Sequence, residues 1–68
     1  MFTMELLFVD SFISDFKGRQ YEIFTFVDPT SLSIIRGTNI INGTLEKGKI
    51  YKCTIGYKNN RLIVESVK

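Results

Sequence analysis

The chain has 68 residues, nine of them basic and seven acidic, so its formal net charge is +2. This length allows one small domain, residues 1–68, which buries only roughly 60% of its unfolded surface. The sequence has no His, and Cys53 is its only cysteine. These counts exclude an internal disulfide and a clustered Cys/His zinc site, so we expect no metal and no cofactor.

The sequence shows no membrane segment or secretory signal. Its longest wholly apolar run, Leu6 to Val9, is four residues long, whereas a transmembrane helix needs roughly 18. The amino terminus carries Glu5 and Asp10 instead of a basic region before a long apolar stretch. With its lone thiol, the chain fits a reducing compartment, and we expect a cytoplasmic protein without a membrane partner.

The composition favours strands over helices. Val, Ile, Thr, Tyr and Phe together make 28 of the 68 residues, and Ala is absent. β-Branched and aromatic side chains lose rotamer freedom in a helix but pack well on a pleated sheet. The composition therefore predicts an all-β fold.

Turn-forming residues divide the first half of the chain into three extended segments. The first covers residues 3–12 and ends before the turn-forming stretch Ser14–Gly18. The second covers residues 20–27 and ends at the Asp-Pro-Thr-Ser turn of residues 28–31. The third is short, residues 32–36, and Gly37 closes it.

A polar link, residues 38–47, leads to two further segments. The fourth segment covers residues 49–58 and the fifth covers residues 61–67; Asn59-Asn60 between them indicates a tight hairpin, since Asn tolerates a positive φ. Five short strands at this spacing predict a small closed barrel, because a flat sheet would leave one apolar face in water.

Enzymatic chemistry finds little support in the sequence. Without His there is no imidazole base, and Cys53 lies mid-segment in the apolar phase formed with Tyr51 and Ile55, where a thiol is usually structural. No Walker or dinucleotide glycine spacing occurs, and no acidic pair is fixed in a cleft. We expect a protein that is not an enzyme.

The second segment offers two alternating faces, of which only one can point into a barrel. One face carries Tyr21, Ile23 and Val27, and the other carries Phe24 and Phe26. If the first face is the core, Phe24 and Phe26 form an exposed platform on which nucleobases stack. If the second face is the core, that platform does not exist.

The charges are unevenly distributed along the chain. Residues 1–35 carry a net charge of −3 and residues 36–68 one of +5. A barrel that gathers the cations on one side would attract polyanions; otherwise they form an ordinary solvated face. The candidate phosphate contacts are Lys17, Arg19, Arg36, Lys52, Lys58 and Arg61.

Residues 45–64 resemble the last two strands of oligonucleotide-binding (OB) barrels. Leu45 and the Lys-Gly-Lys of residues 47–49 lead into a long strand, a hairpin and a short apolar return. The resemblance implies binding through strands two and three and through the loops joining strands one–two and four–five. One departure is the link of residues 38–46, which is too short for the helix that many such barrels place there. Ile40, Ile41 and Leu45, or a second subunit, would then close the barrel. An SH3-like barrel is the alternative to this OB-like one.

Two functions follow as expectations. The first is binding of single-stranded nucleic acid, DNA more than RNA, with bases stacked on Phe24 and Phe26 and phosphates held by the six cations; the resemblance further implies a plasmid, phage or other mobile element as its source. The second is a β-barrel module that binds or inhibits another protein or forms a homodimer, by pairing of strand edges.

Overall fold

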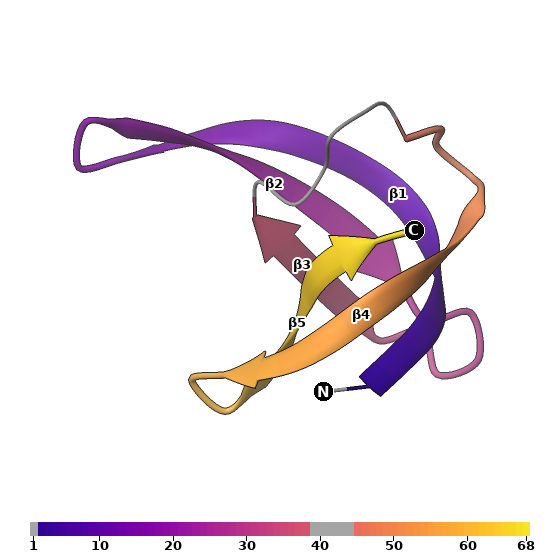
Figure 1. Cartoon of the computed structure of the whole chain (residues 1–68). Coiled ribbons are helices and arrows are strands. Elements are labelled where there is room, and N and C mark those ends of the chain that lie inside the picture. Colours follow the sequence, from indigo (N-terminus) through magenta and orange to yellow (C-terminus); the bar gives the residue numbers. More distant parts are fainter. Residues whose placement is uncertain (1, 39–44) are drawn as a thin grey trace.

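The computed structural model describes residues 2–38 and 45–68, which form a closed barrel of five strands (Figure 1). The predicted all-β fold is confirmed. The strands are β1 (Phe2–Phe16), β2 (Arg19–Val27), β3 (Ile34–Thr38), β4 (Ile50–Lys58) and β5 (Arg61–Val67).

The strand order around the barrel is β1-β2-β3-β5-β4, with β4 pairing back onto β1. Strands β1, β2 and β3 follow one another through antiparallel pairs, and β4 returns to the free side of β1. The resulting spatial order β4-β1-β2-β3 is a Greek key. Strand β5 then closes the barrel between β4 and β3, antiparallel to β4 and parallel to β3.

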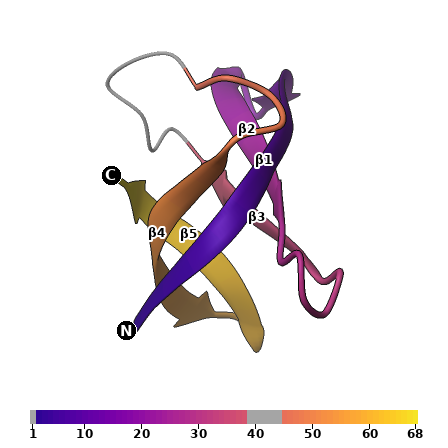
Figure 2. The ribbon, with the colours of Figure 1, turned by 90° about the vertical axis from the view of Figure 1, so that its right-hand side faces the viewer.

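Strand β1 is longer than the sequence predicts. The turn-forming stretch of residues 14–18 was expected to end it, but only Lys17 and Gly18 form the turn, with φ of 52° and 76°. Positive φ at both central residues is the type I′ geometry that matches the twist of a hairpin. The end of β1 and the start of β2 therefore project beyond the barrel as a two-stranded arm (Figures 1 and 2).

The second hairpin turn agrees with its prediction. Asn59 and Asn60 connect β4 to β5 with φ of 53° and 62°, and the fifth segment has the predicted bounds. Tolerance of Asn for the left-handed region explains this tight reversal.

The aromatic face of β2 points into the barrel. Phe24 is 6% exposed and Phe26 is fully buried. Both rings pack on Phe8 of β1, with ring centroids 6.1 Å and 5.4 Å from it. The expectation of an exposed Phe24–Phe26 platform is therefore wrong: both rings belong to the core, and the half-buried Ile23 and the buried Thr25 alternate with them on the other face of β2.

Leu6, Ile35, Cys53, Ile55 and Val64 complete the core around these three rings. Leu45 packs against this core, as the closure of the barrel by the polar link predicts. Ile40 and Ile41, its predicted partners, lie outside the described residues.

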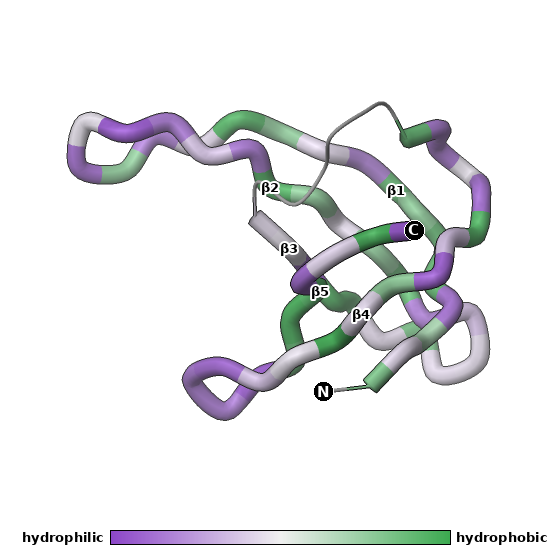
Figure 3. The backbone as a smooth tube through the Cα atoms, in the orientation of Figure 1, coloured by the Kyte–Doolittle hydropathy of each residue, from purple (hydrophilic) through white to green (hydrophobic). Residues whose placement is uncertain are grey.

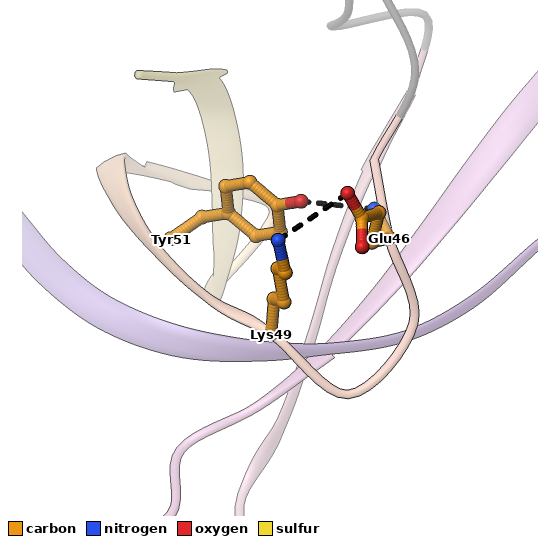
Figure 4. Close-up of polar contacts among 3 residues, drawn as sticks. All are labelled: Glu46, Lys49 and Tyr51. Carbon is orange, nitrogen blue, oxygen red and sulfur yellow. Dashed lines mark hydrogen bonds and ion pairs between the residues drawn. The ribbon is translucent and has the colours of Figure 1, made fainter.

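Glu46 joins the end of the link to β4. Its backbone N–H donates to the Tyr51 hydroxyl at 2.9 Å, and its carboxylate lies 3.3 Å from the Lys49 ammonium (Figure 4). Gly48, which lies between Glu46 and Lys49 in the sequence, has a φ of 85°, and its backbone N–H donates to the Phe8 carbonyl at 2.9 Å. These contacts fix the start of β4 against β1.

We predict that Phe26→Ala lowers the free energy of unfolding by about 3–5 kcal/mol, because it removes a fully buried ring. A core of this size supplies a total of about that much, so circular dichroism should show a largely unfolded chain at 25 °C. Phe16→Ala is the matched control: the exposed Phe16 ring should contribute within about 0.5 kcal/mol. Equal, small effects of the two substitutions in urea titrations would contradict the buried position of Phe26.

Candidate functional site

A groove follows the junction of β3 and β5. These parallel strands share one Cα pair, Arg36 with Ile63, and the groove along their junction has a volume of about 760 Å³. Its apolar floor includes Ile23, Ile34 and Ile63. Arg36, Lys58 and Arg61 also line it, so the fold brings together three of the predicted cations from three different strands.

The register explains why these cations converge. Lys58 and Arg61 are direct partners across the β4–β5 hairpin, so they share one face of the ribbon. Ile63 lies two residues beyond Arg61, on the same face, and is the partner of Arg36. Arg36 and Arg61 are therefore diagonal neighbours across the junction.

The tight Asn59-Asn60 turn holds two like charges opposite each other. Direct opposition of like charges on paired strands is destabilising. The residues of the β4–β5 turn are hydrophilic (purple in Figure 3). A bound anion would relieve the repulsion between Lys58 and Arg61.

None of the three groove cations forms an ion pair with a carboxylate of the described residues. The ion pair found there, Lys49 with Glu46, lies at the start of β4. Glu65 is the one acidic residue among the described side chains that line the groove. Its carboxylate lies over Gly56, where a Cβ atom would collide with it. The groove thus carries three cations against one anion.

The other predicted cations lie elsewhere. Lys52 is the partner of Glu5 across the β1–β4 pair. Lys17 and Arg19 lie at the tip of the projecting arm, where the Lys17 ammonium is 5.4 Å from the centre of the Phe16 ring. None of these three lines the groove.

Sequence reasoning missed the aliphatic floor of the groove. Ile23 lies on the face of β2 that was considered a possible core face. Nothing in the residue patterns of β3 and β5 indicated that Ile34 and Ile63 are surface residues. The described groove lining contains no aromatic side chain. Tyr57, which precedes Lys58 on β4, is an exposed ring next to the groove cations in the sequence.

No family model, curated protein or solved structure matches the chain. In the described ranges, no helix has the length and apolarity needed to cross a bilayer.

Cys53 is a core residue, in agreement with its predicted structural role. The side chain is fully buried, and its thiol lies 3.6 Å from the Tyr51 carbonyl. Burial disfavours the thiolate and raises the pKa of Cys53 to about 11 from an ordinary value of 9.0. The thiol is therefore a poor nucleophile at neutral pH.

We predict that Cys53 makes stability fall as the pH rises from about 9 to about 11. In this window the unfolded chain releases the thiol proton while the folded chain retains it, so ionisation favours unfolding. Urea titrations at pH 8 and pH 10.5 should show a larger loss for the native chain than for Cys53→Ala, which lacks the thiol but keeps every other titrating group. Identical pH dependence of the two proteins would contradict the raised pKa.

Proposed function

We propose that this chain is a non-enzymatic binder of single-stranded nucleic acid, built on an OB-type barrel, whose ligand lies in the β3–β5 groove. The observation that carries the proposal is the convergence of Arg36, Lys58 and Arg61 on one groove without carboxylate partners in the described chain. Cations placed in this way neutralise phosphates and release counterions.

The topology supports an OB-type barrel over the SH3-like alternative. An OB barrel is a five-stranded Greek key that binds oligonucleotides on strands two and three and with the loops joining strands one–two and four–five; in this chain the one–two loop lies at the tip of the arm and does not line the groove. Here β4-β1-β2-β3 form a Greek key closed by β5. The groove is lined by β2 through Ile23, by β3 through Arg36 and by the β4–β5 hairpin through Lys58 and Arg61.

The groove suggests a division of roles. The planar guanidinium groups of Arg36 and Arg61 can each donate two parallel hydrogen bonds to a phosphate, while Lys58 acts as a point charge. Ile23, Ile34 and Ile63 would contact sugars and base faces between the phosphates. No ring takes over the stacking role of Phe24 and Phe26 in the groove: Tyr57 is exposed, but it precedes Lys58 on β4 and therefore points to the opposite face of the strand.

The groove, of about 760 Å³, has room for a short stretch of single strand. The low net charge of +2 also makes this local cluster, and not the whole surface, the source of attraction. Affinity should therefore depend on a few named side chains.

Fluorescence anisotropy with a labelled oligo-dT tests the proposal. We expect binding at low salt that weakens steeply as the salt concentration rises, and a salt slope that drops by about 0.7 for each phosphate contact removed, as in Arg36→Ala and Arg61→Ala. Glu65→Gln should strengthen binding, because it removes the groove's acidic group. Lys52→Ala is the matched control, a cation outside the groove, and should leave the slope nearly unchanged.

Absence of binding at low salt would overturn the proposed function. Equal losses for Lys52→Ala and Arg36→Ala would show that only the general charge matters and would remove the groove from the account. Tighter binding of a duplex than of oligo-dT would contradict the single-stranded ligand.

A further inference from the structure

The outer edge of the projecting arm has no strand beside it in the described chain. Strand β1 pairs with β4 over Phe2–Leu7 only, whereas its pairing with β2 continues to Phe16. The edge from Asp10 to Phe16 that faces away from β2 is therefore open. Such an edge presents unpaired N–H and C=O groups that form a template for another strand.

The devices that usually protect an edge are missing from the middle of this segment. A register shift lies at Val9, before the segment, and the stretch Ser-Phe-Ile-Ser of residues 11–14 carries no charge and no proline. Phe12, Ile13 and Phe16 are exposed large apolar side chains on it. A two-stranded ribbon of this kind is only marginally stable when it stands alone in water.

The ladder determines which groups point outward. The type I′ turn at Lys17-Gly18 closes on Phe16 and Arg19, which are partners in the β1–β2 register. Turns of this kind join their closing residues by hydrogen bonds, and the pattern then alternates along an antiparallel ladder. The backbone groups of Ser11, Ile13 and Asp15 consequently point away from β2, toward the open edge.

We propose that this edge pairs with the same edge of a second copy of the chain, antiparallel and centred on Ile13. Two-fold symmetry requires a self-complementary register. Only a centre on Ile13 pairs all three outward-pointing residues with one another, as Ile13 with Ile13 and Ser11 with Asp15 of the second copy. The two strands of one arm and the two strands of the other then form one continuous sheet.

Side chains on this register are complementary. Each Ser11 hydroxyl, which lies 3.4 Å from the Glu22 carboxylate of its own chain, faces the Asp15 carboxylate of the second copy and can donate to it instead, and the two Ile13 side chains meet at the axis. Asp10 of each copy is opposite Phe16, so it lies beside the turn of the other copy that carries Lys17 and Arg19. Hydrogen-bonded and oppositely charged cross-strand pairs stabilise a sheet.

A disulfide placed on the axis tests the contact and its register. Directly opposed residues of an antiparallel pair have Cα atoms about 4.5–5.5 Å apart, within the range of a disulfide. With oxidised glutathione as the oxidant, Ile13→Cys should give a covalent dimer in high yield. Ile34→Cys is the matched control: Ile34 is 60% exposed against 59% for Ile13, but it lies on β3, between β2 and β5 and away from the open edge. The buried Cys53 is present in both variants and should not react.

Sedimentation of the reduced proteins gives an independent readout. The native chain should dimerise reversibly with rising concentration. Ile13→Lys, which puts two ammonium groups on the axis, should stay monomeric. Ile34→Lys should dimerise as the native chain does. A monomeric native chain, equal crosslinking of the two Cys variants, or faster crosslinking of Phe12→Cys would overturn the proposal. Because the groove lies on β3 and β5, loss of the dimer and loss of oligonucleotide binding are separate results.

Discussion

The structure depends on the packing of Phe8, Phe24 and Phe26 inside the barrel. Since side chains alternate along a strand, burying Phe24 and Phe26 in the core turns Ile23 and Thr25 to the other face of β2, where Ile23 is half-buried and Thr25 is covered by its neighbours. The register to β3 then places the exposed Arg36 beside Thr25. One aromatic cluster in the core therefore decides which side chains are available to a ligand.

The junction of β3 and β5 has the fewest paired residues of the strand contacts in the described barrel. A single Cα pair joins the two parallel strands, and the surface there is hollow. The tight β4–β5 turn adds two opposed cations, Lys58 and Arg61, to this hollow. Their mutual repulsion opposes folding of the free protein and would be relieved by a polyanion, which is the physical link between the fold and the proposed function.

Local signals were sufficient for several features. Strict alternation around Cys53 and Ile55 identified the inner face of β4, and Asn59-Asn60 located the last turn. The phase of β2 could not be decided in this way, because both of its faces carry large apolar side chains. Burial of Phe24 follows from its contact with Phe8, which lies 16 positions earlier in the chain. The alternation of side chains within one strand does not reveal such a contact between strands.

Local sequence patterns also could not predict which cations lie close together. The basic character of residues 36–68 was visible in the sequence, but which cations gather depends on how the barrel closes. Insertion of β5 between β4 and β3 brings Arg36 to Arg61 and leaves Lys52 beside Glu5. Lys17 and Arg19 do not join the groove cations, because β1 is longer than expected and places them at the tip of the arm.

The groove as the ligand site can be tested most directly by following backbone amide resonances of the ¹⁵N-labelled chain during a titration with unlabelled oligo-dT. The account predicts that the resonances of β3 and of the β4–β5 hairpin shift together and saturably, while those of Lys52 and its neighbours stay in place. Shifts concentrated along β1 and the adjoining part of β4, with the groove resonances unmoved, would contradict it.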